Sequence, residues 1–327
     1  MRYGIFSGAL WGLDTVILGI AVLLAPYLGA SEAPLASALL HDLACALVLL
    51  IYMGIRGRLG DTLAALRTRS GRAVMGAALL GGPVGMTGYL IAINNIGPGY
   101  TAIISTFYPA VGTLLAFVLL GERMRPRQVL ALLGALGAII MIGWGTTGAV
   151  EGGSAVVGVL AALACVIGWG SEAVILAWGM REDTVDNETA LHIRQTTSAT
   201  AYLLVVAPLA GVLGFTGRAV LTPATGLVVL AALAGTASYL FYYKAISTIG
   251  ASRGMALNIS YSAWAVLFAL VLQGTVPTPL QVVGCLVVLV GTILAATADW
   301  SDLVLLRRTP PDGAGAQPTS VGTADAL

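Results

Sequence analysis

Apolar residues fill this chain in long runs, and short polar or arginine-bearing connections separate the runs. A run of about 20 apolar residues is long enough to cross the hydrocarbon core of a membrane as a helix. Ten such windows occur, at residues 4–25, 34–55, 73–95, 100–120, 127–145, 155–179, 189–214, 224–248, 254–273 and 279–299. The pattern predicts an all-α membrane protein with ten transmembrane helices.

Composition agrees with this prediction and narrows the functions that the chain can have. Of the 327 residues, 58% are hydrophobic and only 9% are charged, so the chain is not a soluble domain. It has no basic patch for nucleic acid, no phosphate loop and no metal-spaced cysteine pair. We therefore expect no cofactor, no metal and no nucleic-acid partner. The sequence also shows no nucleophile–base pair of the kind that an intramembrane enzyme would require.

Basic residues are distributed unevenly among the connections between the predicted helices. If the N-terminus is cytoplasmic, thirteen of the sixteen Lys and Arg residues fall on the cytoplasmic side, as the positive-inside rule describes. Ten helices then place the C-terminus on the same side. Residues 301–327 are rich in Pro, Gly, Ala, Ser and Thr without periodicity, which predicts a disordered cytoplasmic tail.

The chain also contains an internal repeat. Shifting it by 153 residues aligns 89–136 with 242–289 without a gap, and 17 of these 48 positions are identical, including Tyr89 with Tyr242 and Gly97 with Gly250. Because five helices precede the second copy, that copy enters the membrane from the opposite side, and the two halves are inverted. We predict a first repeat at 1–148, a second at 149–300 and the tail at 301–327.

A short string containing a carboxylate recurs in the first helix of each half. Trp11-Gly12-Leu13-Asp14 returns as Trp169-Gly170-Ser171-Glu172. Positions i and i+3 share a helix face, so each string presents an indole and a carboxylate together. Both acids lie about ten residues from the helix ends, roughly 15 Å deep at 1.5 Å per residue. A buried acid beside aromatic rings indicates a cation site.

Five other ionisable residues fall within the predicted helices, and each is a functional candidate because such groups are costly in a membrane. His41 and His192 occupy matching places in the two halves and are either proton-relay or gating groups, or neutral side chains bonded to a neighbouring helix. Lys244 is expected to extend to the membrane surface. The Arg194 side chain either extends to the membrane surface or forms an ion pair with Glu172 or with Asp183.

The charges within the helices do not balance. Three acids (Asp14, Asp42, Glu172) oppose two bases (Arg194, Lys244), which leaves a charge of −1 with neutral histidines. A monovalent cation would balance this charge, and so would a proton on one carboxylate. Both cation binding and proton exchange are therefore compatible with the sequence.

Aromatic residues in mid-helix complete the predicted site. Packing explains any one of them, but a methylated ammonium needs aromatic faces and a counter-ion because it cannot donate hydrogen bonds. The candidate substrate-binding residues are Trp11, Asp14, Tyr89, Tyr108, Trp169, Glu172, Tyr239, Tyr242, Asn258, Tyr261 and Trp264. The candidates for proton coupling or gating are Asp14, Glu172, His41, Asp42 and His192. The cluster Gly81-Gly82-Pro83-Val84-Gly85 predicts a kinked or unwound backbone beside this site.

These features resemble the drug/metabolite transporter superfamily, EamA type. The resemblance covers residues 4–299 and includes the two five-helix halves and the Trp-Gly strings. Within the superfamily, the chain is similar to the Lic-type bacterial choline permeases. The strings that carry this similarity are His41-Asp42, Gly82-Pro83-Val84-Gly85-Met86, Trp169-Gly170-Ser171-Glu172, Ile193-Arg194-Gln195 with Thr197-Ser198, and Leu257-Asn258-Ile259-Ser260-Tyr261. Asp14 is a possible departure from that pattern.

The resemblance implies a secondary transporter of the bacterial inner membrane that imports choline or a similar quaternary ammonium, driven by the proton gradient. Its partners would be the cation, protons and membrane lipid. Glu172 is expected to act as the main counter-ion, with Asp14 as a second acid. The alternative is an exporter of amino acids, metabolites or cationic drugs. A scaffold protein would not need the buried acids.

Overall fold

The computed structural model describes residues 1–144, 153–181 and 185–300. Helices account for nearly all of this part of the chain, and it contains no strand. The elements are α1 (Arg2–Val22), α2 (Ala33–Ile55), α3 (Leu59–Ala65), α4 (Arg69–Leu79), η1 (Leu80–Met86), α5 (Thr87–Ser105), α6 (Tyr108–Leu120), α7 (Pro126–Trp144), α8 (Ala155–Gly179), α9 (Asn187–Ala201), η2 (Tyr202–Val206), α10 (Ala207–Leu209), α11 (Leu213–Ala219), α12 (Pro223–Ile249), α13 (Ala251–Asn258), α14 (Tyr261–Gln273) and α15 (Pro279–Ala296).

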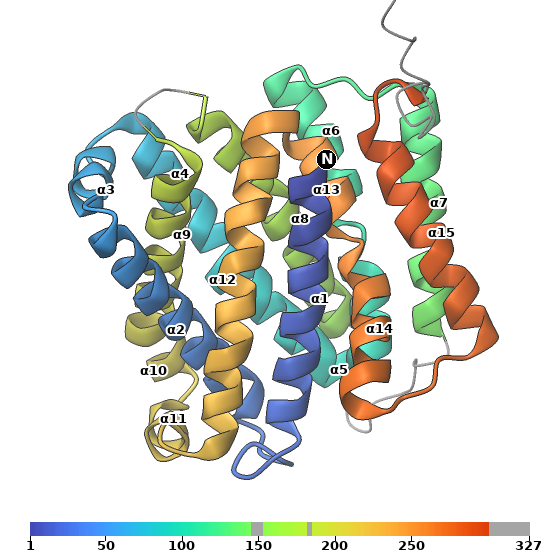
Figure 1. Cartoon of the computed structure of the whole chain (residues 1–327). Coiled ribbons are helices and arrows are strands. Elements are labelled where there is room, and N and C mark those ends of the chain that lie inside the picture. The colour runs from blue at the N-terminus through green and yellow to red at the C-terminus, as the bar shows by residue number, and fades with distance from the viewer. Residues whose placement is uncertain (145–152, 182–184, 301–327) are drawn as a thin grey trace, which may run out of the picture.

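The prediction of an all-α membrane protein is confirmed. Eight helical segments in the described ranges are long and apolar enough to cross a membrane. The shorter α7 and the continuous segment α9–η2–α10 occupy the two remaining positions, which gives ten helices in two inverted sets of five. The helices form one bundle, with α7 and α15 side by side at its edge (Figure 1). The proposed boundary near 148 and the tail lie outside the described residues and stay predictions.

One predicted helix ends earlier than the hydrophobic pattern indicates. The window 189–214 predicts one transmembrane helix, but the helix ends at Leu209 and the chain turns by 119° into α11. Gly211 adopts a left-handed conformation (φ 71°) at this turn, which glycine reaches without strain. The apolar residues beyond the turn belong to α11.

The two halves repeat the same backbone conformations. Gly97 has φ 78° and ψ 162° and its counterpart Gly250 has φ 89° and ψ 164°, so both interrupt a helix in the same way. Gly121 (φ 68°, ψ 17°) and Gly274 (φ 67°, ψ 15°) both end a helix in the left-handed conformation. The 153-residue offset found in the sequence therefore relates backbone conformations as well as residue types.

Small residues bring α1 close to the second half. A methyl group on Gly4 would overlap with Leu257, one on Gly8 would overlap with the Ser260 side chain, and one on Gly12 would press on the Trp264 Cβ. Because glycine has no side chain, α1 packs directly against α13 and α14. The four-residue spacing of these glycines thus allows close helix packing.

On the arginine-rich side, Arg58 joins the start of α3 to the start of α9. Its guanidinium donates to Asp61 (2.8 Å), Asp186 (2.9 Å) and Glu188 (2.5 Å). Burial of Asp186 opposes its ionisation, but the Thr189 amide and Arg58 together hold the pKa of the Asp186 carboxyl below its ordinary value of 3.8. The contribution of the Asp186 carboxylate to the free energy of unfolding is therefore complete at neutral pH. It is lost as the pH falls through this lowered pKa.

Arg58→Gln is expected to lower the free energy of unfolding by about 1 to 2 kcal/mol, because it removes a partly exposed group of three charge pairs. The difference from the parent protein should shrink in high salt. Thermal unfolding in detergent at two salt concentrations measures both effects. Arg67→Gln, on the same connection, is the control. Equal losses for the two variants would contradict the prediction.

Candidate functional site

Each half of the protein buries one acid–base pair in the interior of the bundle. Asp14 Oδ1 lies 3.0 Å from His41 Nε2, and the Arg194 Nε donates to Glu172 Oε1 at 2.7 Å. In both pairs the acid belongs to the first helix of its half (α1 or α8) and the base to the second (α2 or α9). The sequence left the partner of Arg194 open, and the structure identifies it as Glu172.

Polar contacts join the two pairs into one connected group, which we call the central network: Asp14, His41, Asp42, Gln195, Arg194 and Glu172. His41 Nδ1 lies 3.9 Å from Asp42 Oδ1. Gln195 donates to the same Asp42 oxygen at 2.9 Å and accepts from Arg194 at 2.9 Å. The two repeated acids are therefore the ends of one chain of contacts that crosses from α1 to α8. Ser198 adds a hydrogen bond to Asp42 at 2.5 Å.

The central network is buried and carries unbalanced negative charge. Asp14 and Arg194 are each 3% exposed, and Glu172 and His41 are each 8% exposed. Three carboxylates oppose one guanidinium, so the net charge is −2 with a neutral His41 and −1 with a protonated one. Lys244 is exposed on α12 and does not take part. Because uncompensated charge is costly in a membrane interior, the network favours binding of cations.

Glycines from the opposite half make room for both acids. A methyl group on Gly81 of η1 would overlap with the Glu172 carboxylate. Similarly, a methyl group on Gly235 of α12 would stand 3.2 Å from Asp14 Oδ2 and 3.1 Å from His41 Nε2. Each acid is thus enclosed only where the two halves meet.

The backbone beside Glu172 departs from regular α-helix. Residues Leu80–Met86 form a π-helical turn with Pro83 inside it, which confirms the predicted distortion of the glycine–proline cluster. Proline removes a backbone donor and leaves carbonyl groups that need other partners. The Gly81 carbonyl accepts from Trp169 Nε1 at 3.0 Å, and the Gly82 carbonyl accepts from the Tyr202 hydroxyl at 3.4 Å. The turn is therefore held in a defined shape.

Aromatic rings adjoin both ends of the central network. The Arg194 guanidinium lies over the Tyr239 ring, 4.9 Å from its centroid, and Trp11 meets the same ring edge-on at 5.0 Å. On α8, three residues before Glu172, Trp169 packs against Tyr89 (5.5 Å) and Tyr108 (5.9 Å). The two strings that contain the acids thus place their indoles in equivalent aromatic contacts.

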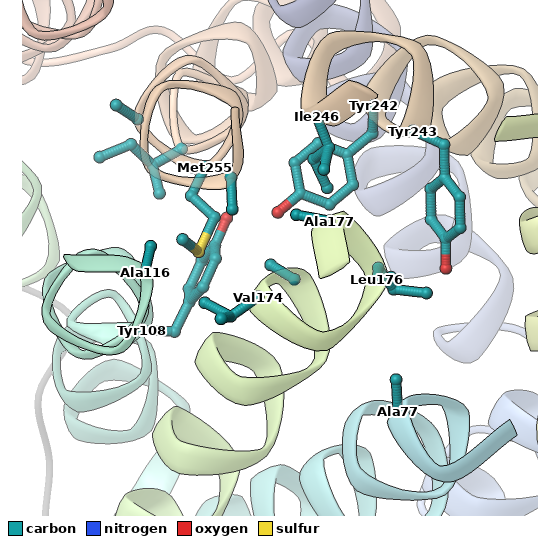
Figure 2. Packing of buried hydrophobic residues seen from close by; sticks show 14 of the residues in the cluster. Ala77, Tyr108, Ala116, Val174, Leu176, Ala177, Tyr242, Tyr243, Ile246 and Met255 are labelled. Atoms are coloured by element: carbon teal, nitrogen blue, oxygen red, sulfur yellow. The ribbon is translucent and has the colours of Figure 1, made fainter. Parts of the chain in front are cut away.

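Consecutive tyrosines on α12 extend this aromatic lining. The rings of Tyr242 and Tyr243 lie 6.3 Å apart, and Tyr243 lies 6.3 Å from Tyr239. Figure 2 shows the Tyr242 and Tyr108 hydroxyl groups pointing toward one another, with Met255 beside Tyr108. Among the described residues, the Tyr243 hydroxyl is a buried group without a hydrogen-bond partner. Polar groups of this kind are usually satisfied, so this hydroxyl is a candidate contact for a ligand.

Three predicted site residues lie in other surroundings. Asn258 donates to Ser7 at 3.2 Å, and the Thr62 hydroxyl lies 2.9 Å from His192 Nδ1. The Trp264 Cβ faces Gly12. Tyr261, at the start of α14, instead lies within electrostatic reach of Tyr89 and Tyr108 beside Trp169. His192 is therefore in the surroundings of a hydrogen-bonded structural histidine, whereas His41 belongs to the central network.

Three residues of this region were not among the predicted site residues. Gln195 and Ser198 bind Asp42, and Tyr243 has the unpartnered hydroxyl. The first two stand four or fewer residues from Arg194 on one polar helix, which was the available signal. Nothing in the sequence distinguishes Tyr243 from Tyr242.

A model of the EamA-like transporter family matches residues 6–144 and again residues 156–297. The chain belongs to the EamA-like transporter family. This confirms the resemblance to EamA-type drug/metabolite transporters, and it identifies the chain as a multi-pass transporter. Members of such a family are not enzymes, which agrees with the sequence analysis.

Two further comparisons refine this assignment. Over 200 residues the transporter is 28% identical to Protein LicB of Haemophilus influenzae, and the match covers 58% of this chain and 63% of LicB. A solved crystal structure shares the fold with a TM-score of 0.65, at 21% identity over 90% of this chain and 95% of the other. LicB agrees with the Lic-type resemblance, and the crystal structure supports the fold alone.

Proposed function

We propose that this transporter imports choline or a similar quaternary ammonium by proton-coupled alternating access. The observation that carries the proposal is the central network, in which the buried carboxylates of Asp14 and Glu172 and the partly buried carboxylate of Asp42 face one guanidinium and one imidazole. A monovalent cation reduces the uncompensated charge of this network. The match to LicB and the resemblance to Lic-type choline permeases point to the same class of cargo. A bacterial inner membrane with both termini cytoplasmic is the location we propose.

The aromatic residues favour a methylated ammonium over a metal ion or a primary amine. A trimethylammonium group cannot donate hydrogen bonds, so its recognition relies on aromatic faces, each contributing about 0.5 to 2 kcal/mol, and on a nearby carboxylate. Tyr239, Trp11 and Trp169 supply rings beside the two acids. We propose that the cation binds between these rings when the transporter opens.

An unpartnered hydroxyl supports a cargo that also carries a polar group. Tyr243 is 1% exposed, and its side chain lies within electrostatic reach of Glu172 and Arg194. Choline places a hydroxyl two carbons from its nitrogen and would give this group a partner. A zwitterion fits less well, because the carboxylate of such a cargo would have to displace Glu172 from Arg194.

The alternative is an exporter of amino acids, metabolites or cationic drugs with the same fold. Direct measurement distinguishes the two. The purified chain is tested in a thermal-shift assay against choline, betaine, an aromatic amino acid and a polyamine at several pH values. Uptake of labelled choline is then measured in vesicles of known orientation. We expect choline to stabilise the protein and to accumulate in the cytoplasmic compartment. Absence of any choline shift at every pH would reject the proposal, and transport in the outward direction would favour the exporter.

Trp169→Leu is expected to raise the Kd for choline about 2- to 30-fold, because it removes one aromatic face worth roughly 0.5 to 2 kcal/mol. Binding is measured by calorimetry or by the thermal shift as a function of choline concentration. Trp178→Leu is the matched control, since Trp178 lies on the same helix beside Arg69 and outside the central network. If both variants bound choline like the parent protein, Trp169 would not line the site.

Tyr243→Phe is expected to weaken choline binding about two- to tenfold, the value of one hydrogen bond. The affinity for tetramethylammonium, which has no hydroxyl, should change less than about twofold. Comparing the two ligands in one variant separates the hydroxyl contact from a general change in the site. An equal loss for both ligands would contradict this role for Tyr243.

A further inference from the structure

His41 differs from the other base of the central network in one chemical respect. The two bases hold equivalent places, one opposite Asp14 and one opposite Glu172. Arginine stays protonated at every physiological pH, whereas imidazole gains and loses a proton there. Of the two bases, only His41 can change its charge during a transport cycle.

The surroundings of His41 favour a second proton on the ring. Its Nε2 faces Asp14 Oδ1 at 3.0 Å, and its Nδ1 faces Asp42 Oδ1 at 3.9 Å. A neutral imidazole has one N–H donor, so it can serve only one of two carboxylates, while the protonated ring has a donor for each. A proton on His41 therefore adds a positive charge between Asp14, at hydrogen-bond distance, and Asp42, at ion-pair distance.

The other groups around His41 do not replace that proton. On its own helix, Cys45 Sγ lies 3.7 Å from Nδ1 and donates to the Ala232 carbonyl. From α12, Gly235 approaches the ring and Tyr239 lies within electrostatic reach. The nearest base is Arg194 of α9, which is paired with Glu172. Among the described residues, His41 is thus the base in direct contact with Asp14, while Asp42 lies between His41 and the electrostatic reach of Arg194.

We propose that His41 carries the co-transported proton and that one proton and one monovalent cation enter together. The inference rests on the proposed function. The central network has four possible occupancy states: −2 when empty, −1 with a proton or a cation alone, and 0 with both. Only the state with both ligands is neutral and avoids uncompensated charge in the membrane interior. Exchange of a proton for the cation would keep the network at −1 throughout.

The contacts also explain how the proton affects a distant cation. From His41, the connection to Glu172 runs through Asp42, Gln195 and Arg194. The hydrogen bonds from Gln195 to Asp42, from Arg194 to Gln195 and from Arg194 to Glu172 are each 2.9 Å or shorter. Charge on His41 draws Asp42 toward the ring and changes the hydrogen bonds that position Arg194. Binding of the proton is thereby coupled to binding of the cation through Asp42, Gln195 and Arg194, and no single one of these groups has to contact both ligands.

The coupling ratio is measured with the full chain in vesicles whose membrane potential is clamped at zero. For one proton per cation, a tenfold choline gradient is balanced by about one pH unit, since both represent about 1.4 kcal/mol. In His41→Gln no pH gradient should balance the choline gradient, while choline still stabilises the protein. The control is His192→Gln, which alters the chain's other histidine and should keep the parent ratio. A ratio of two, or a pH dependence that survives in His41→Gln, would overturn the proposal.

A second measurement does not depend on the folding of a variant. The chain has only two histidines, so isotope-labelled histidine gives two imidazole signals, and His192→Gln assigns them. On addition of choline to the wild-type protein, the His41 signal should move to the doubly protonated form. A His41 signal that stays neutral in acid without choline, and is unchanged with it, would also overturn the proposal. Failure of choline to bind at all is seen separately in the thermal-shift assay and would count against the proposed function.

Discussion

Arg194→Met is expected to destabilise the transporter by about 3 to 5 kcal/mol, the cost of breaking a buried ion pair by removing one partner. Arg194 is the one guanidinium of the central network and is 3% exposed. Its removal leaves three carboxylates with only His41 as a base, and it also removes the contacts to Gln195 and the Tyr239 ring. The loss is measured as a lower temperature and free energy of unfolding in detergent.

Two further variants test the cause of this effect. Glu172→Gln combined with Arg194→Met should recover a large part of the lost stability, because no charge of that pair then remains buried. Lys244→Met is the control for loss of a positive charge, since Lys244 is exposed. A double variant as unstable as Arg194→Met would show that lost packing, and not the unpaired Glu172 carboxylate, causes the effect.

Gly81→Ala is expected to reduce transport to background. The added methyl group would occupy the position of the Glu172 carboxylate, so Glu172 must move away from Arg194 or the π-helical turn must shift. Overpacking in a close-packed interior costs about 1 to 3 kcal/mol. Displacement of the carboxylate adds the cost of separating its ion pair. Uptake of labelled cargo in vesicles measures the loss, and thermal unfolding measures the stability.

Gly76→Ala is the matched control for Gly81→Ala. Gly76 lies on the preceding helix α4, and a methyl group there meets no atom within 4 Å. Alanine favours helix more than glycine does, so this variant should transport normally and be at least as stable as the parent. Similar behaviour of the two alanine variants would show that the space beside Glu172 is not restricted.

The sequence predicted the helical framework well because a membrane restricts the possible structures. Backbone groups in lipid must be satisfied within helices, so apolar windows translate directly into elements. The internal repeat paired Gly97 with Gly250, and the structure shows that both interrupt a helix. The end of the seventh helix was not predicted correctly, because the apolar residues beyond Gly211 belong to the separate helix α11 and hydropathy does not register the 119° turn.

The sequence predicted many of the residues that belong to the candidate site, but not which of them contact one another. Asp14 and Glu172 were found because their strings repeat, and both are buried in the interior. The partner of Arg194 could not be derived, since the choice depends on helix rotation about its axis, which sequence spacing does not determine. The two histidines looked equivalent, yet helix packing brings His41 to two acids and His192 to Thr62.

The glycines that enclose the acids come from opposite halves, and this arrangement bears on how the protein arose. Asp14 is enclosed by Gly235, and Glu172 by Gly81. A half made alone would expose its carboxylate to lipid, where a charged group is strongly disfavoured. An ancestor of only five helices would therefore have needed a second copy inserted upside down to shield its acid. Joining the two halves in one polypeptide fixes their ratio and relative orientation.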